Sequence, residues 1–277
     1  MAGFFGFFDY SKPGKGVDKD APQKKRFFYF FELYFRKFWK LITLNLMYVL
    51  FCIPIITIGP ATAAMSKILR DFSMERSVFL WSDFVEAFKK NFKQGLAMEI
   101  IDILVFFVAI TSCVFYSRWA GQNKVMYVPF VIVGAILIVA VMMNYFIFVM
   151  IPTLDMKLKA MIRNAFLLSI LALKTNVCTL IFTLLFSFAV FFYLPAAIIL
   201  VPTIYFSTLG FIIVFNSYQY LEKYIIQPYY EQTGERRPDV YYPDEDEFDE
   251  DDVIFEDIGT REQPVQTATV KKGKTIK

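Results

Sequence analysis

Residues 45–64, NLMYVLFCIPIITIGPATAA, decide how the whole chain is placed. The first half of this stretch is apolar enough to enter a bilayer, but Pro54, Gly59 and Pro60 interrupt it before the next charged residue. Crossing ~30 Å of hydrocarbon takes about 20 mostly apolar helical residues. The apolar run 41–58 is therefore a marginal span, which either crosses fully or turns back at the prolines.

The composition is that of a membrane protein. The 277 residues are 57% hydrophobic and 19% aromatic, with a mean hydropathy of +0.47, far from the profile of a soluble domain. The chain has no histidine, which removes the commonest general base and metal ligand. Cys52, Cys113 and Cys178 lie inside apolar runs and predict small packing residues rather than disulfides or a metal cluster. We therefore expect no metal and no cofactor.

Four further runs are long and apolar enough to cross a membrane. They are residues 96–117, 126–151, 176–194 and 196–217. The first two are joined by a short connection and the last two by a bend at Pro195, so each pair predicts a helical hairpin. The expected fold is an all-α, polytopic membrane helix bundle with about five hydrophobic segments and amphipathic interfacial helices.

The distribution of Lys and Arg predicts which connections face the cytoplasm. Connections 60–95 and 153–175 are rich in Lys and Arg, whereas the hairpin turns hold only Arg118 and Lys124. We therefore place both connections, and the C-terminal tail, on the cytoplasmic side. The first 40 residues carry nine Lys and Arg, which a full crossing of 41–58 would leave outside. We favour a turn back, which implies that the other spans cover the break at 54–60.

Three regions follow along the chain. Residues 1–40 form a basic, aromatic segment, in which 27–40 have the aromatic stripe of a helix lying in the membrane interface. Residues 41–228 form the transmembrane domain. Residues 229–277 hold ten carboxylates between positions 244 and 257 and predict a disordered tail.

A tandem repeat is a further hypothesis. Amphipathic segments 81–94 and 158–173 each precede a hairpin, so the order interfacial helix, span, turn, span occurs twice. Asn144 and Asn216 hold similar places near the ends of the second spans.

The sequence contains no catalytic constellation. A Gly-rich phosphate loop, a Ser/His/Asp arrangement, a CxxC pair and HExxH are all missing, so we expect no enzyme. The basic front end is better explained by anionic lipid than by nucleic acid. The lipid bilayer is therefore the first expected partner.

Polar and backbone-shaping residues within the apolar runs are the candidate functional or structural positions. They are Asn45, Pro54, Thr57, Gly59, Pro60, Glu99, Asp102, Asn144 and Asn216. Glu99 and Asp102 are one helical turn apart and either face a cavity, where they accept a cation or a sugar hydroxyl, or lie at the interface. We favour the interface, where they would pair with Lys89 or Lys93, and we expect the asparagines to bridge helices.

The segment LNLMYVLFCIPIITIGPATAAM, followed by DFVEAFKKNFKQG, resembles the signature of the YesL-like family of small multi-pass bacterial membrane proteins. The resemblance covers roughly residues 4–224. It implies a bacterial cell-membrane location and an accessory or scaffold role in carbohydrate uptake or sensing, beside a sugar ABC transporter or another membrane complex. It implies no reaction. The alternative left open by the residues is a small-solute channel or transporter that uses Glu99 and Asp102.

Overall fold

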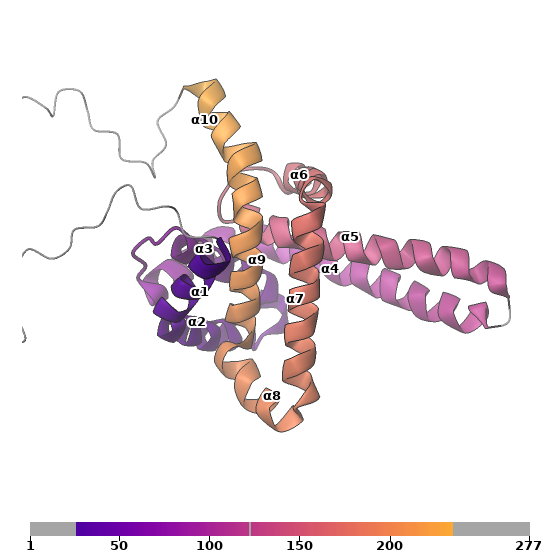
Figure 1. Cartoon of the computed structure of the whole chain (residues 1–277). Helices are drawn as coiled ribbons and strands as arrows, with labels where there is room; N and C mark the ends of the chain where they lie inside the picture. Colours follow the sequence, from indigo (N-terminus) through magenta and orange to yellow (C-terminus); the bar gives the residue numbers. More distant parts are fainter. Residues whose placement is uncertain (1–25, 122, 235–277) are drawn as a thin grey trace, which may run out of the picture. The chain divides into compact units, whose positions relative to one another are not determined.

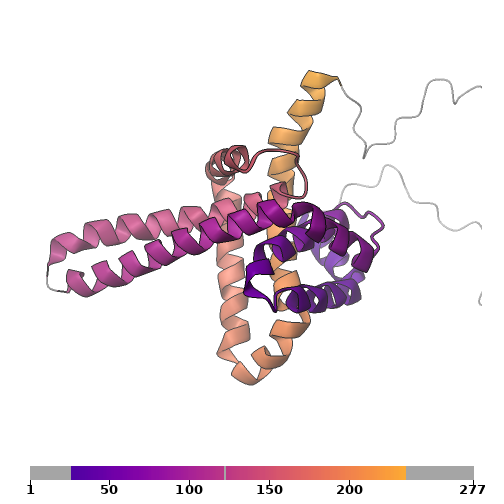
Figure 2. The same cartoon turned by 180° about the vertical axis from the view of Figure 1, so that it is seen from behind.

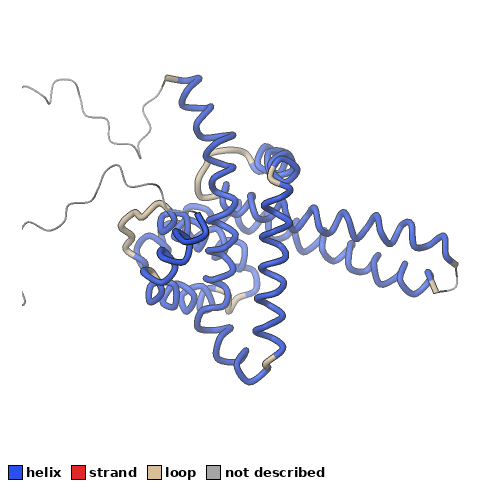
Figure 3. Tube along the Cα trace, in the orientation of Figure 1, coloured by secondary structure: helices blue, strands red, loops and turns tan. Residues whose placement is uncertain are grey.

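The computed structural model describes residues 26–121 and 123–234. Within these residues the secondary structure is helical, without strands, which confirms the all-α prediction (Figure 3). Most of the basic front end and nearly all of the acidic tail lie outside the described residues. The chain divides into a unit Met1–Tyr229 and a unit Tyr230–Lys277, and the fold of the first unit follows.

Among the described residues, four helices are long and apolar enough to cross a membrane, as the sequence predicts. Pro195 lies in the first turn of the short helix that follows the bend, where its missing N–H needs no partner. The last of the four helices, Ala197–Thr233, contains two π-helical segments. In chain order the elements are α4 (Leu80–Ala120), η2 (Lys124–Met126), α5 (Tyr127–Met150), α7 (Leu173–Phe192), α8 (Leu194–Leu200), η3 (Val201–Tyr205), α9 (Phe206–Leu221), η4 (Glu222–Ile226) and α10 (Gln227–Thr233) (Figure 1).

The apolar run 41–58 turns back instead of forming a fifth long span. Helix α1 (Arg26–Arg36) leads into α2 (Phe38–Phe51), whose 14 residues reach only about 21 Å. After a break and the short η1 (Ile55–Thr57), α3 (Ile58–Ser73) follows. The contacts of Glu75, just after α3, show where the chain has gone: Tyr29 donates to its carboxylate at 2.9 Å, and Arg36 lies 2.6 Å from the same oxygen. The end of α3 therefore lies beside α1, so the chain goes out along α2 and comes back along α3.

Helix α3 is the centre of this unit. Eleven of its sixteen residues are buried, among them Ala61, Ala64 and Phe72. It packs against α2, α4, α5 and α9. The sequence predicted a cytoplasmic connection over 60–95 because of its Lys and Arg residues. The structure shows that the first part of this connection is a buried helix, since small side chains such as Ala61 and Ala64 let neighbouring backbones approach closely, which hydropathy does not register.

The break between α2 and α3 is not covered by other helices, contrary to our expectation. Ile53 and Ile55 are 73% and 72% exposed, and Pro54 is exposed too, whereas Gly59 and Pro60 are buried. Hydrogen bonds within the break pair some of its polar groups instead. The Thr57 hydroxyl reaches the carbonyl oxygens of Phe51 and Pro54, both at 2.6 Å. These two bonds pair carbonyl groups on either side of the break, so part of its backbone is satisfied locally.

The two hairpins differ in how they begin. Residues 81–94 are not a separate interfacial helix, because α4 runs unbroken through Gly95 into its span. In the second hairpin α6 (Leu158–Leu171) does end before α7, at Ala172. Only 17% and 6% of the most apolar windows of α4 and α5 are buried, and this hairpin projects beyond the other helices (Figures 1 and 2).

The three cysteines are free thiols, as the sequence predicts. Cys178 is exposed on α7, so the expectation that it packs inside the bundle is wrong. An apolar position on a membrane-spanning helix can face lipid as readily as protein, and composition does not distinguish the two.

Candidate functional site

Helices α3 and α4 cross at two glycines. A Cβ atom built on Gly59 would meet the carbonyl oxygen of Gly95 and lie 2.8 Å from the Cβ of Glu99, and one on Gly95 would lie 2.7 Å from the Cα of Pro60. Gly59 lies in the first turn of α3 and its φ is not positive. Glycine is therefore required here by close backbone approach, not by an unusual backbone conformation.

Glu99 caps the start of α3 at this crossing. Its side chain is buried, with 6% exposure, and Oε2 accepts the backbone N–H of Gly59 at 3.0 Å. The first turn of a helix has unpaired N–H groups and a partial positive charge, which a carboxylate satisfies. Pro60 adds no N–H to this turn. The predicted pairing of Glu99 with Lys89 or Lys93 is wrong, since no ion pair joins them in the described part of the chain.

Asp102, one turn further along α4, pairs with Asn144 of α5. The Asn144 amide donates to Asp102 Oδ1 at 3.0 Å and to the Ala140 carbonyl at 3.1 Å. Asn144 Oδ1 is buried and has no donor among the described residues. Asp102 forms no ion pair with Lys89 or Lys93 in the same part of the chain, so that prediction is wrong here too.

Two cavities meet at this pair, and both are lined by Asp102 and Asn144. The first, here called the outer groove, has a volume of about 590 Å³ and lies among α4, α5 and α6. The second, the inner cavity, has about 350 Å³ and lies among α3, α4, α5 and α9. Apart from Asp102 and Asn144, the outer groove is lined by apolar side chains.

Asn45 joins α2 to the π-helical segment η3. Its fully buried amide donates to the carbonyl oxygens of Val201 at 3.1 Å and Pro202 at 2.7 Å, and its Oδ1 accepts the Ser207 N–H at 2.9 Å. A π-helical turn interrupts the regular α-helical bonding pattern and leaves backbone groups in need of partners. The prediction that Asn45 bridges helices is what the structure shows.

Asn216 and Asn144 occupy equivalent places in the two hairpins. Asn216 of α9 donates to the Thr179 hydroxyl of α7 at 3.0 Å, as Asn144 of α5 donates to Asp102 of α4. In each hairpin an asparagine of the second span thus bonds the first span. The tandem repeat stays a hypothesis, and this shared type of bond between the two spans of each hairpin supports it.

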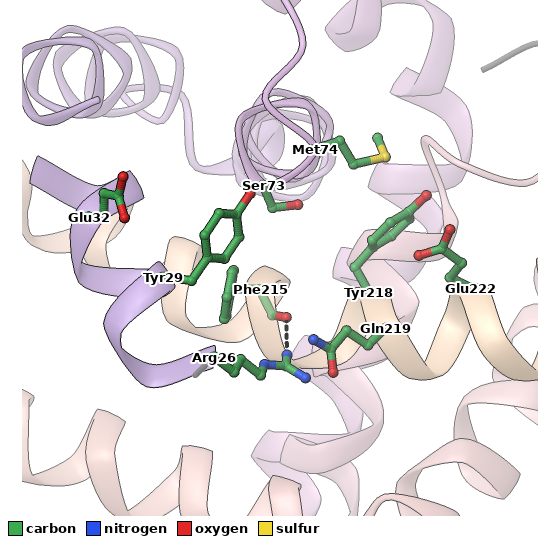
Figure 4. A pocket seen from close by; sticks show the side chains of 9 residues that line it. All are labelled: Arg26, Tyr29, Glu32, Ser73, Met74, Phe215, Tyr218, Gln219 and Glu222. Carbon is green, nitrogen blue, oxygen red and sulfur yellow. Dashed lines mark hydrogen bonds between the residues drawn. The ribbon is translucent and has the colours of Figure 1, made fainter. Parts of the chain in front are cut away.

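A polar pocket of about 620 Å³, here called the terminal pocket, was not predicted from the sequence (Figure 4). Arg26 donates to the carbonyl oxygen of Phe215 at 2.6 Å and lies 4.8 Å above the centre of its ring. Burial lowers the pKa of the Arg26 guanidinium. The terminal pocket is lined by residues of α1, the end of α3, α9 and η4. They are Arg26, Tyr29, Glu32, Ser73, Met74, Phe215, Tyr218, Gln219 and Glu222.

Helix α1 was expected to lie in the membrane interface, and only part of its surface is available for that. Phe27 and Phe35 are 62% and 67% exposed, but Leu33 is buried and the Phe30 ring lies tilted against Phe211, with 5.2 Å between ring centres. Helix α1 therefore has one exposed aromatic side, with Phe27 and Phe35, and another side that packs against the rest of the chain. An aromatic helix pattern alone does not reveal this division.

Glu75 clamps the end of α3 to α1. It has a left-handed backbone, with φ of 58°, at the position after a helix where glycine is favoured. The Arg36 guanidinium, followed by the Tyr29 hydroxyl, holds the pKa of the Glu75 carboxyl below its usual value. The bonds to Arg36 and Tyr29 offset the backbone strain of a glutamate at this left-handed position.

Residues 41–113 match the model of a family described as "Protein of unknown function, DUF624". The match spans α2, α3 and most of α4, and so includes the Gly59–Gly95 crossing and its cap Glu99. No curated protein and no solved structure matches the chain.

Proposed function

We propose that this chain is a non-catalytic protein of the bacterial cell membrane, an accessory or scaffold component in carbohydrate uptake or sensing. The observation that carries the proposal is how polar groups inside the apolar helices are used. Asn45, Glu99 and Asn216 each bond a neighbouring helix. Side chains committed in this way hold a bundle together and are not free to line a path for solute.

The link to carbohydrate rests on the resemblance of 44–65 and 83–95 to the YesL-like family. The family match over 41–113 covers the same segments and fits that resemblance. We place the basic connections and the C-terminus in the cytoplasm on the charge distribution.

The α4–α5 hairpin is the surface that we propose for a partner within the bilayer, such as the membrane subunit of a sugar ABC transporter. The apolar windows of both helices are largely uncovered by the rest of the described chain. On this hairpin, a Cβ built on Gly134 would meet nothing within 4 Å. A larger residue at 134 therefore alters the outer surface without an internal clash.

Purification of the tagged full-length protein from its native membranes in mild detergent tests this function. We expect a sugar-transporter membrane subunit in stoichiometric amount, reduced by Gly134→Phe. Phe188→Trp is the matched control, because Phe188 is 66% exposed on α7 and the change adds bulk away from the hairpin. Wild-type protein that purifies without a partner and conducts solute in liposomes would contradict the accessory role.

A small-solute channel or transporter is the second candidate. It is favoured by the position of Asp102 in the lining of both the outer groove and the inner cavity, beside Asn144 Oδ1, which has no donor from the described part of the chain. Solute flux in liposomes that hold the purified chain, lost in Asp102→Leu with normal folding, would support it.

A further inference from the structure

The pair of Asp102 and Asn144 lacks one hydrogen-bond donor. Both amide hydrogens of Asn144 are used, on Asp102 Oδ1 and on the Ala140 carbonyl. Its Oδ1 is buried without a donor from the described residues. Turning the amide over would not help, because it would point Oδ1 at those same two acceptors.

An ionised Asp102 cannot supply the missing donor, because a carboxylate only accepts hydrogen bonds. A protonated carboxyl has one O–H to donate. A carboxylic acid and a primary amide can then form two antiparallel bonds: the amide N–H to one carboxyl oxygen, and the carboxyl O–H to the amide oxygen. The first of these is present at 3.0 Å.

The surroundings of Asp102 also disfavour a charge. Among the described residues that line the outer groove and the inner cavity, Asp102 is the sole member of the Asp, Glu, Lys and Arg types. Helices α3, α6 and α9 present no charged side chain to it there. The titratable neighbours are Tyr145 of α5, whose hydroxyl pairs with Thr183, and Glu99 on its own helix, which caps α3. A carboxylate in apolar surroundings without a counter-ion is costly and tends to take up a proton instead.

We propose that Asp102 is a proton-binding site, whose carboxyl carries a proton and donates it in a hydrogen bond to Asn144 Oδ1. The proton ties α4 to α5 at the pair that lines both the outer groove and the inner cavity. Loss of the proton breaks that bond and places a charge between two cavities. This site is independent of the accessory role, which requires no proton.

Infrared spectroscopy of the full-length protein in lipid nanodiscs at neutral pH tests the proposal. We expect a carbonyl band of a protonated carboxylic acid, which moves when aspartate is labelled with carbon-13 at its side-chain carboxyl. The wild-type protein alone gives this result, so it does not depend on a variant that folds.

Two substitutions assign the band. It should vanish in Asp102→Asn and persist in Asp83→Asn, since Asp83 lies on the same helix and bonds the Phe79 N–H at an exposed site. In Asn144→Leu it should move to higher frequency, because the carboxyl loses its amide partner. Asp102→Asn should melt close to wild type, since an amide pair keeps both bonds, whereas Asp102→Leu should melt lower.

The absence of a label-sensitive acid band in the wild type would overturn the proposal. A co-purifying amphiphile that donates to Asn144 would be a different donor and would overturn it as well. An acid band that survives in folded Asp102→Asn would place the proton elsewhere and would have the same consequence.

Discussion

Replacing Gly59 by alanine tests the closest contact in the bundle. The added Cβ would lie 2.8 Å from Glu99 Cβ and meet the Gly95 carbonyl, which as backbone cannot rotate away. Carbon atoms pack best at about 3.5 to 4.0 Å, so α3 and α4 must separate by roughly 1 Å. That separation also breaks the 3.0 Å bond from Gly59 N–H to Glu99.

The cost of this change has two parts. Overpacking costs about 1 to 3 kcal/mol, and a buried acceptor left without its partner costs about 1 to 3 kcal/mol. Alanine recovers about 0.5 to 1 kcal/mol as the better helix former. We therefore expect Gly59→Ala to lower the free energy of unfolding by about 3 kcal/mol.

Equilibrium unfolding of the full chain in mixed micelles, followed by circular dichroism as the denaturing detergent increases, measures this loss. Gly134→Ala is the matched control, because its Cβ meets nothing within 4 Å and should stabilise the protein by about 0.5 to 1 kcal/mol. The reasoning fails if Gly59→Ala unfolds like the wild type, or if the two substitutions are equally harmful.

Three further predictions concern single polar contacts. The pKa of Glu75 is lower in the folded protein than in the unfolded chain, where it is about 4.3. Glu75 therefore stabilises the fold at pH values above the unfolded pKa, and this stabilisation is lost as the pH falls through the folded pKa. The pair of Glu75 with Arg36 is about half exposed, so its contribution is less than about 1 kcal/mol. The melting temperature of the wild type should therefore fall slightly more than that of Glu75→Gln as the pH is lowered, and melting temperatures that change in parallel with pH would refute this. Asn45→Leu leaves its three backbone partners unpaired and should cost about 3 kcal/mol in the same unfolding assay, where a neutral result would contradict the proposed role. Asn216→Leu and Thr179→Val should each cost about 1 kcal/mol and the double variant hardly more than either, whereas additive losses would show that the two side chains do not interact.

The four long spans were predictable from the sequence because hydropathy over 20 residues measures what a bilayer selects. The bend at Pro195 was predictable because proline restricts the backbone in a known way. The central position of α3 was not, since its burial depends on close approach of Ala61, Ala64 and Gly59 to other helices rather than on apolar area. Lys67, one of the charged residues behind the prediction of a cytoplasmic connection, lies at a half-buried position of this helix.

The roles of the candidate residues divide in the same way. That Asn45 and Asn216 bridge helices followed from the cost of an unpaired amide in an apolar segment. That Glu99 caps α3 did not follow, because its partner Gly59 is 40 residues away and no local pattern connects them. The terminal pocket draws on segments still further apart, from Arg26 to Glu222.

The return of α2 and α3 to their starting side is the central claim, and cysteine accessibility tests it most directly. Single cysteines are placed at Lys19, Ser77 and Lys124, after replacement of the three native cysteines. With an impermeant thiol reagent added to intact cells, we predict labelling at position 124 alone, with positions 19 and 77 reacting only after lysis. Labelling at 19 but not at 77 in intact cells would show that the chain crosses the membrane between them, and would contradict the account.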